Sequence, residues 1–332
     1  MNKDFSLLDA NLARVKEGLR VMEDIVRFVF ADKELFEAVK VLRHSLSQTE
    51  IWFGTGHIIR ARFGTDIGTE QSTKTEFERS SMYSIIRANA SRVTEALRTL
   101  EEFAKIYTNK NAFLFQKARY QVYALERDLM MRTPHFYLYQ YFEEGVVYPI
   151  SDSIEELKDY IDAGAKVVQL RDKSENKQLI QQKVKELCRY LQKRYSEGKE
   201  KVVFILNDHV DLATRLPVDG VHIGQEDMEV NRARIQIGSN KIIGRSTHNS
   251  EQANRAVLEG VDYIGVGPVY ATPTKSERKA IGLDTLEIIA ETVPLPLVAI
   301  GGIDPGNVRE IYAQGVRNVA VVRSAKKFFG LK

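Results

Sequence analysis

Two aspartates follow neighbouring predicted strands in the second half of this chain. Asp208 comes directly after one apolar run and Asp227 after the next, with Asn207 beside the first. If the strands are parallel neighbours, their carboxyl ends share an edge and the two carboxylates lie close together. Mg²⁺ is held by one or two carboxylates plus substrate phosphate oxygens. Each Asp could instead cap the helix after it, but the pair favours a metal.

Cations flank the same edge. Arg171 and Lys173 follow the strand before Asp208, and Lys275 follows a later strand in a loop with Thr272 and Thr274. Cations that face a metal across a shared opening are typical of a diphosphate site. A solvated surface role is the alternative for any single lysine. The two threonine hydroxyls favour the diphosphate interpretation.

A second anion site is indicated near the C-terminus. Gly301 and Gly302 follow a strand, Asp304 and Pro305 are expected to open a helix, and Ser324 follows the last strand. Backbone N–H groups at such positions bind phosphate in parallel barrels. Paired glycines can also serve a tight turn alone.

Gln169 and His222 are expected between the two anion sites, where they would hydrogen-bond a nitrogen heterocycle. A buried histidine bonded to backbone is the alternative. We expect no nucleophilic serine or cysteine, because Cys188 falls in mid-helix and Ser246 has no positioned histidine partner.

Short apolar runs alternate with helical patterns from Val146 onward, which predicts a (β/α)8 TIM barrel over 146–332. The eighth helix is expected to be short or absent, because the sequence given stops soon after the last strand. The predicted strands span 146–151, 166–171, 202–207, 220–223, 241–245, 261–266, 296–300 and 318–323, and the predicted helices include 153–163, 176–195, 250–259, 283–291 and 305–314.

Composition limits the class of protein. The 332 residues are 43% hydrophobic and 28% charged, enough for two globular cores. A net charge of +3 without a basic block argues against nucleic acid as a partner. A single cysteine and the absence of an apolar leader or a bilayer-length apolar stretch predict a cytoplasmic protein with no membrane partner.

Residues 1–138 have 3.6-residue periodicity and few strand signals, which predicts an all-α domain. The segment at 8–20 repeats at 86–98 with a constant offset of 78, which indicates two duplicated helical hairpins. The repeated polar residues either fix the register between helices or line an anion-binding cleft. The cleft candidates are Asn11, Arg14, Glu17, Arg43, His44, Arg60, Arg62, Asp66, Asn89, Arg92, Glu95 and Arg119.

The stretch at 134–142 is rich in aromatic residues, so we expect it to pack on the bottom or side of the barrel. A short eighth helix would expose one flank of the first and last strands. We expect the helical domain, this aromatic stretch or a second subunit to cover that flank.

The barrel motifs closely resemble thiamine phosphate synthase over about 146–324. The motifs are Gln169-Leu170-Arg171-Asp172-Lys173, Leu206-Asn207-Asp208, the segment 219–227, the segment 265–275 and Ala299-Ile300-Gly301-Gly302-Ile303. The resemblance implies coupling of hydroxymethylpyrimidine diphosphate to a thiazole phosphate, with release of diphosphate. One departure is Arg323, where the family usually carries an apolar residue.

The resemblance also implies a role for each site residue. Asp208 and Asp227 would hold Mg²⁺, and Gln169 and His222 would face the pyrimidine. The diphosphate would contact Arg171, Lys173, Asn207, Ser246 and Lys275, while the thiazole phosphate would contact Thr272, Thr274, Gly302 and Ser324. The related thiazole tautomerase and a non-catalytic sensor are rivals, but an isomerase has no diphosphate that would need the paired aspartates.

The helical part resembles the alternative hydroxymethylpyrimidine-phosphate kinase domain that precedes some of these synthases. The residues that carry this include Leu8-Asp9-Ala10-Asn11, Glu17-Gly18-Leu19-Arg20, Arg43-His44 and Glu95-Ala96-Leu97-Arg98. The resemblance implies that ATP and Mg²⁺ are used at a first site to make the pyrimidine diphosphate. A helical dimerisation or capping module without chemistry is the alternative, since no glycine-rich nucleotide loop is present.

Overall fold

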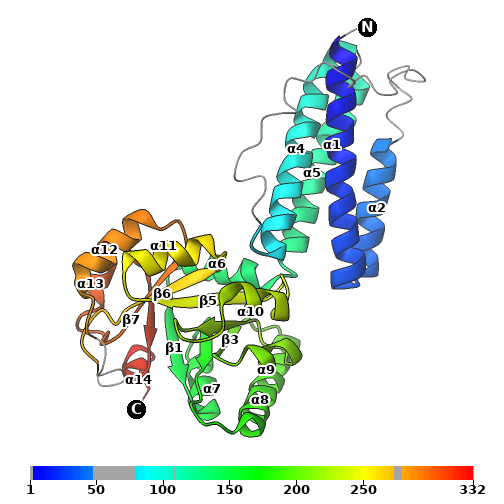
Figure 1. The fold of residues 1–332 in the computed structure, drawn as a ribbon. Helices are drawn as coiled ribbons and strands as arrows, with labels where there is room; N and C mark the ends of the chain where they lie inside the picture. Colours follow the sequence, from blue (N-terminus) through cyan, green and yellow to red (C-terminus); the bar gives the residue numbers. More distant parts are fainter. Residues whose placement is uncertain (1–2, 48–78, 108, 273–278, 332) are drawn as a thin grey trace. The chain divides into compact units, whose positions relative to one another are not determined.

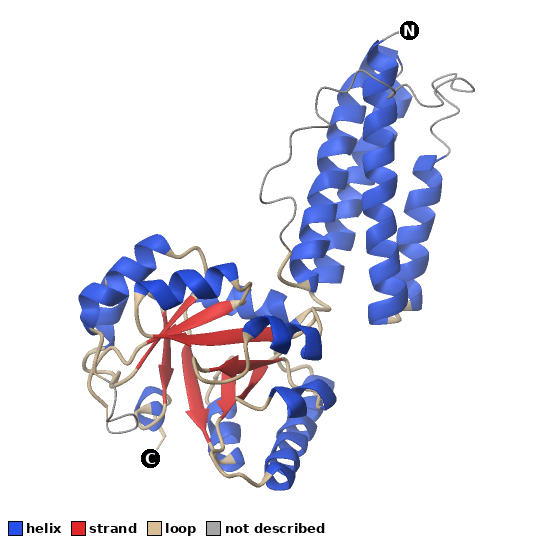
Figure 2. Cartoon of the chain, viewed as in Figure 1, coloured by secondary structure: helices blue, strands red, loops and turns tan. Residues whose placement is uncertain are grey.

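The computed structural model describes residues 3–47, 79–107, 109–272 and 279–331. These residues form two compact units, Met1–Arg132 and Thr133–Lys332. The first unit is helical, and the second is a closed barrel surrounded by helices (Figures 1 and 2). No described helix is both long and apolar enough to cross a membrane.

Eight parallel strands close the barrel in sequence order, with the last strand paired to the first. This confirms the predicted barrel, and each predicted strand end lies within two residues of the observed one. The strands are β1 (Val147–Ser151), β2 (Val167–Leu170), β3 (Val203–Asn207), β4 (Gly220–Ile223), β5 (Ile242–Thr247), β6 (Tyr263–Val266), β7 (Leu297–Ile300) and β8 (Asn318–Val321).

Polar side chains cap three of the helices that follow the strands. Ser153, Asn176 and Asn249 each accept a hydrogen bond from the third residue after them. The helices are α7 (Ile154–Asp162), α8 (Lys177–Ser196), α9 (Val210–Arg215), α10 (Val230–Ile237), α11 (Ser250–Leu258), α12 (Gly282–Thr292), α13 (Val308–Ala313) and α14 (Ala325–Phe328). Helix α13 starts later than predicted, because Asp304 accepts from the Gly306 N–H in a turn before it.

Alternate residues of each strand enter two different cores. In β3, Phe204 and Leu206 pack outward under the helices, whereas Val203 and Ile205 pack with the barrel interior. Successive side chains of a strand point to opposite faces of the sheet. Because helices cover one face here and the barrel interior buries the other, residues on both faces must be apolar. This explains the continuous apolar runs of the sequence.

Helix α6 (Pro134–Glu144), formed by the aromatic stretch, closes one end of the barrel interior. Its Leu138, Tyr141 and Phe142 are buried in the same core as the inward residues of the strands. The Phe142 ring meets the Tyr263 ring edge-on, with 5.5 Å between centroids. The expected packing at the bottom of the barrel is therefore observed.

The eighth helix is short, as predicted, but a different segment covers the flank beside it. Phe328, Phe329 and Leu331 pack against the outer core, and the Phe329 ring lies 5.5 Å from the ring of Tyr160. The expectation that the aromatic stretch covers this flank is wrong, because α6 is used at the barrel end. The residues after β8 supply the missing apolar surface themselves.

The helical unit contains α1 (Lys3–Ile25) with a π-helical end (Val26–Phe30), α2 (Lys33–Ser47), α4 (Met82–Tyr107) and α5 (Asn109–Met130). Helix α1 packs against α2 and α4, and α4 packs against α5. The two long helices that carry the repeat therefore pack against each other, and each also packs against the second helix of its own hairpin. Helical periodicity predicts one apolar stripe in this segment, formed by Val15, Leu19, Met22, Val26 and Val29. The first four are buried, but the prediction is wrong at Val29, which is 47% exposed in the π-helical end.

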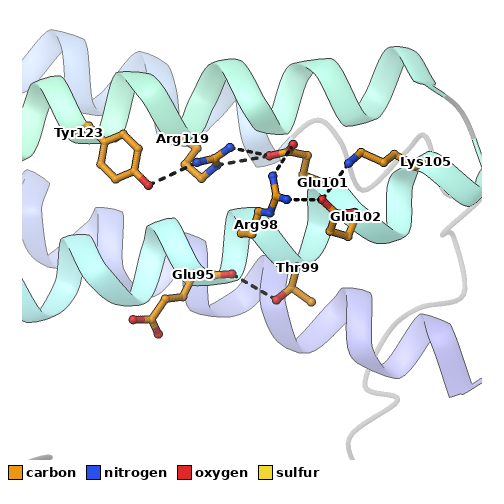
Figure 3. Close-up of polar contacts among 8 residues, drawn as sticks. All are labelled: Glu95, Arg98, Thr99, Glu101, Glu102, Lys105, Arg119 and Tyr123. Carbon is orange, nitrogen blue, oxygen red and sulfur yellow. Dashed lines mark hydrogen bonds and ion pairs between the residues drawn. The ribbon is translucent and has the colours of Figure 1, made fainter.

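Both copies of the repeat contain the same buried ion pair. Glu23 on α1 accepts a hydrogen bond from Arg43 on α2 at 2.6 Å, and Glu101 on α4 accepts one from Arg119 on α5 at 3.0 Å. Each glutamate is 3% exposed. Figure 3 shows Glu101 between Arg119 and Arg98. These pairs link the two helices of each hairpin and so fix their register.

The repeated Asn, Arg and Glu residues do not make such links. The side chains of Asn11 and Asn89 donate to the carbonyls of Leu7 and Ile85 in their own helices. Their partners Arg14, Glu17, Arg92 and Glu95 are exposed, as is His44. Among the described residues, the register is therefore held by the Glu–Arg pairs, which leaves the exposed members of the triplets facing solvent.

We expect replacement of Gly18 by valine to destabilise the helical unit. A Cβ at this position would lie 2.5 Å from the Val93 Cγ2 atom and 3.1 Å from the Asn89 carbonyl oxygen. Overpacking of this kind costs about 1–3 kcal/mol. The measurement is urea unfolding followed by circular dichroism. Ala38→Val, at an exposed position of α2, controls for a β-branched residue in a helix, and equal losses in the two variants would refute the crowding argument.

A candidate active site at the carboxyl ends of the barrel strands

A cavity of about 310 Å³ opens at the carboxyl ends of the strands, at the end of the barrel opposite α6. Inward residues of the strands and the loops after β6, β7 and β8 form its wall. The predicted site residues in the wall are Gln169, Arg171, Asn207, His222, Ser246, Thr272, Gly302 and Ser324. Thr274 and Lys275 lie outside the described residues, as do Arg60, Arg62 and Asp66 of the helical unit.

Asp208 and Asp227 come together beside this cavity, as the strand order predicts. Burial raises the pKa of Asp208 to about 6, with a further contribution from the charge and hydrogen bond of Asp227, while Arg171 and Asn207 act in the opposite direction. Neither aspartate caps a helix, because the N-cap residues of α9 and α10 are His209 and Glu229. Asp208 has φ 62°, a conformation that Asp tolerates better than most residues.

A cation fits this pair. Two carboxylates in contact repel each other when both are ionised, and a divalent ion between them would remove that repulsion. The described residues contain no group of three or more histidine, cysteine, aspartate or glutamate side chains suited to a metal. The remaining ligands would therefore be water or substrate oxygens, as Mg²⁺ prefers.

The predicted cations are not all placed together. Arg171 lines the cavity, whereas Lys173 is exposed on the loop after it and does not line the cavity. Arg323 and Lys327 were not predicted as ligands, yet both line the cavity near the paired glycines. Arg323 is the position that departs from the usual apolar residue.

The glycine end of the cavity has the backbone shape expected of a phosphate loop. Gly301 and Gly302 have φ values of 103° and 67°, which favour glycine. A Cβ on Gly302 would lie 2.7 Å from the Tyr270 Cβ atom. The Ser324 hydroxyl donates to the Ile303 carbonyl at 2.6 Å. The hydroxyl would therefore have to turn away from Ile303 to donate its hydrogen to a phosphate.

A chain of hydrogen bonds crosses the floor of the cavity. Gln169 Nε2 donates to the Tyr148 hydroxyl at 2.8 Å, which lies 3.2 Å from the Tyr263 hydroxyl. The Tyr263 hydroxyl lies 3.0 Å from His222 Nδ1, and His222 Nε2 lies 2.9 Å from Ser246 Oγ. The expectation that Ser246 has no histidine partner is wrong, because β4 and β5 are neighbours and both side chains point inward.

Comparison with known proteins agrees with this geometry. Residues 145–325 match the thiamine monophosphate synthase family, and residues 6–128 match the ThiD2 family. Relatives from Synechocystis sp. and Nostoc punctiforme, both named thiamine-phosphate synthase, are each 40% identical over 324 residues. The matches cover 96% of this chain and 90% and 89% of theirs. The chain belongs to the thiamine monophosphate synthase family.

A solved structure of the same family agrees with the barrel. Thiamine phosphate pyrophosphorylase from Pyrococcus furiosus is 33% identical, with a TM-score of 0.50. The match covers 57% of this chain and 93% of the Pyrococcus chain. Both resemblances inferred from the sequence, the synthase barrel and the kinase-like helical domain, are thus confirmed.

Sequence reasoning missed the two tyrosines in the cavity floor of this synthase barrel. Tyr148 and Tyr263 are 1% and 0% exposed, and both line the cavity. Strand alternation could have identified these tyrosines, because Tyr148 and Tyr263 lie two residues before Ile150 and Gly265, which also line the cavity. Residues two apart in a strand share a face.

The loop that carries Arg171 is held by an ion pair, which gives a pH-dependent prediction. Lys183 Nζ donates to Asp172 at 2.6 Å and to the Asp152 carbonyl at 2.8 Å. Burial alone would raise the pKa of Asp172, but hydrogen bonds from Lys183 and Ser174 outweigh it and lower the pKa to about 2. This stabilisation is complete above the unfolded-state pKa near 4 and is lost as the pH falls towards 2.

Asp172→Asn should therefore lower the unfolding free energy by about 1–2 kcal/mol at pH 7. The difference from the unmodified protein should shrink steadily between pH 4 and pH 2. The measurement is urea unfolding at a series of pH values. A difference in unfolding free energy that is independent of pH over this range would show that the charge of Asp172 is not the source of the stabilisation.

Proposed function

We propose that the barrel condenses 4-amino-2-methyl-5-hydroxymethylpyrimidine diphosphate with 4-methyl-5-(2-phosphoethyl)thiazole and releases diphosphate. The reaction is dissociative: the bond from the pyrimidine methylene carbon to the diphosphate oxygen breaks first, and the thiazole nitrogen then forms a bond to that carbon of the resulting pyrimidine cation. The observation that carries the proposal is the pair Asp208 and Asp227 beside Arg171, at the mouth of a cavity with a separate glycine loop. An isomerase of this fold has no diphosphate to bind at such a pair.

The residues of the site have separate tasks in this reaction. Gln169 and His222 hold the pyrimidine ring in the cavity floor. Arg171, Asn207 and Ser246 hold the diphosphate, and Lys173 and Lys275 are proposed to join them from their loops. As the diphosphate leaves, negative charge grows on its oxygens while positive charge grows on the pyrimidine. Groups fixed in advance around the departing oxygens lower the barrier to this separation.

Mg²⁺ is the proposed cofactor, and Asp208 and Asp227 would hold it. When bound, the metal would supply positive charge to the leaving diphosphate. The two aspartates would fix the position of that charge next to Arg171 and Asn207.

The thiazole phosphate is proposed to bind at Thr272, Thr274, Gly302 and Ser324, with two further contributors. Arg323 and Lys327 line the same part of the cavity and can pair with a phosphate dianion. They would add charge to a site otherwise made by backbone and hydroxyl groups.

We expect Arg323→Ala and Lys327→Ala each to raise the KM for the thiazole phosphate about 10-fold, with little change for the pyrimidine diphosphate. The measurement is initial rate of thiamine phosphate formation with each substrate varied in turn. The control is Lys326→Ala, because Lys326 pairs with Glu156 on α7 and does not line the cavity. A raised KM for the diphosphate alone would assign these cations to the other substrate.

We further propose that the helical unit phosphorylates hydroxymethylpyrimidine phosphate with ATP. Support comes from the ThiD2 match over residues 6–128. It also comes from the exposed, repeated side chains Arg14, Glu17, Arg92 and Glu95, which the helix packing does not use. Because they recur in both copies without a packing role, a ligand-binding role is the simpler account.

The test is ADP release that depends on hydroxymethylpyrimidine phosphate. Arg14→Ala and Arg92→Ala should reduce it strongly, whereas Arg127→Ala, at an exposed arginine that pairs with Asp128, should not. Normal ADP release by both Arg14→Ala and Arg92→Ala would show that these arginines are not part of the proposed site. Unchanged synthase activity on preformed diphosphate would show that the barrel is intact in all three variants.

A further inference from the structure

The floor of the cavity contains an ordered series of hydrogen bonds, and two of its members, Tyr148 and Tyr263, have no role in the proposed reaction. Four contacts join five side chains in the order Gln169, Tyr148, Tyr263, His222 and Ser246. The members come from β2, β1, β6, β4 and β5, so the chain crosses the barrel interior. Its two ends, Gln169 and Ser246, both line the cavity.

The two tyrosines keep their protons. Burial raises the pKa of Tyr148 and of Tyr263 above the ordinary range. Each hydroxyl therefore has one hydrogen to donate and can also accept. A buried hydroxyl hydrogen without an acceptor is costly, so each of the two must be directed along the chain.

The orientation of Gln169 decides the direction of the whole chain. Its Nε2 donates to Tyr148, so the Tyr148 hydrogen must go to Tyr263. The Tyr263 hydrogen must then go to His222 Nδ1. A neutral His222 has its single hydrogen on Nε2 and donates it to Ser246 Oγ. The Ser246 hydrogen is then directed away from His222. The opposite direction would require Gln169 to accept from Tyr148.

This amide orientation suits the proposed substrate. With Nε2 used by Tyr148, the amide oxygen of Gln169 is the atom available to the cavity, and it makes no hydrogen bond to the described residues. A carbonyl oxygen accepts from the amino group of a 4-aminopyrimidine. If the amide were reversed, its N–H group would face the N–H of the substrate amino group, and two donors cannot form a hydrogen bond.

We infer that Tyr263 is a positioning residue that fixes the Nε2–H tautomer of His222 and so leaves the Ser246 hydroxyl as a donor to the diphosphate. This inference rests on the proposed function for the identity of the anion. The tautomer follows from the hydrogen bonds in the floor and does not depend on the identity of the substrate. Tyr263 acts without touching the diphosphate, through His222 and Ser246.

The tautomer is tested by two-bond proton–nitrogen NMR correlations on the full chain labelled with ¹⁵N-histidine. Measurement at a pH where the imidazole is neutral, and assignment by His222→Gln, identify the signal among the six histidines. We expect Nε2 protonated and Nδ1 unprotonated in the unmodified protein. Tyr263→Phe should populate the Nδ1–H form.

The matched control is Tyr160→Phe, which removes a hydroxyl from another buried tyrosine, 2% exposed in the outer core. It should leave the His222 signals unchanged. An Nδ1–H tautomer in the unmodified protein, or an unchanged tautomer in Tyr263→Phe, would overturn the inference. Because no substrate is present, this result is independent of whether the barrel makes thiamine phosphate.

A kinetic cycle tests the consequence for catalysis. Tyr263→Phe should lower kcat/KM for the pyrimidine diphosphate about 10-fold when Ser246 is present. In a Ser246→Ala background, Tyr263→Phe should lower kcat/KM for the pyrimidine diphosphate less than about twofold, because Tyr263 acts through the Ser246 hydroxyl. Equal losses in both backgrounds would show that Tyr263 acts elsewhere and would contradict the inference.

Discussion

Replacement of Asp208 by asparagine is expected to lower the kcat of thiamine phosphate formation about 10³-fold or more. The substitution keeps the size of the side chain and its hydrogen bond to Asn207, but it removes one of the two charges that would hold the metal. Asp227→Asn should have a similar effect. Because the loss is of charge rather than shape, raising the Mg²⁺ concentration should recover part of the rate.

The control for this substitution is Asp211→Asn. Asp211 lies three residues later on α9 and pairs with Lys177 at an exposed position. Its replacement should leave kcat within about twofold, in line with the small contribution of surface ion pairs. Full activity of Asp208→Asn at limiting Mg²⁺ would show that this carboxylate does not hold the metal.

Replacement of Asp262 by alanine is expected to destabilise the barrel by about 3–5 kcal/mol. Asp262 is 1% exposed, pairs with Arg234 at 2.7 Å and accepts the Ile243 N–H at 2.8 Å. His135 on α6 lies 3.3 Å from its other oxygen. Burial alone would raise the pKa of Asp262, but His135 and Arg234 hold it below the usual range. The carboxylate thus ties α6 to the strands.

Calorimetry of the full chain measures this effect. A loss of that size corresponds to roughly 6–20 °C in the Tm of a 150–250 residue unit. Asp159→Ala, at an exposed position of α7, controls for loss of an aspartate and should shift the Tm of the barrel by only about 1–2 °C. A shift for Asp262→Ala no larger than that of the control would mean that α6 is held by its apolar contacts alone.

The strand positions could be predicted because both faces of each strand are covered. This forces continuous apolar runs such as the one ending at Leu206, and each run ends where polar residues face the cavity. The closeness of Asp208 and Asp227 followed from strand order alone, since β3 and β4 are neighbours. Both predictions depend on the pattern of apolar residues and on the order of the strands along the chain, and both can be taken from the sequence.

Contacts between distant segments were harder to predict. The partners of Tyr148 and Tyr263 come from strands far apart in the sequence, and a tyrosine inside an apolar run looks like any core residue. The helical repeat was visible in the sequence, but only side-chain geometry distinguishes Glu23 and Glu101, which join helices, from Glu17 and Glu95, which are exposed. Which of these glutamates is buried depends on which face of the helix packs against a neighbouring helix.

The covering of the barrel flank shows the same limit. The sequence indicated that β1 and β8 lack a full eighth helix, but two aromatic segments could have filled the space. Packing decided between them: α6 carries Leu138 and Phe142 into the barrel interior, while Phe329 reaches Tyr160 on the outer face. Either segment had a suitable composition, so composition alone did not distinguish them.

The most direct test of the account is thiamine phosphate formation by the purified full chain. The chain is incubated with Mg²⁺ and the thiazole phosphate, and with either preformed hydroxymethylpyrimidine diphosphate or the monophosphate plus ATP. The account predicts product from both mixtures, with the second strictly dependent on ATP and reduced by Arg14→Ala or Arg92→Ala. Product from the diphosphate alone would contradict the kinase proposal, and no product from the diphosphate would contradict the synthase assignment itself.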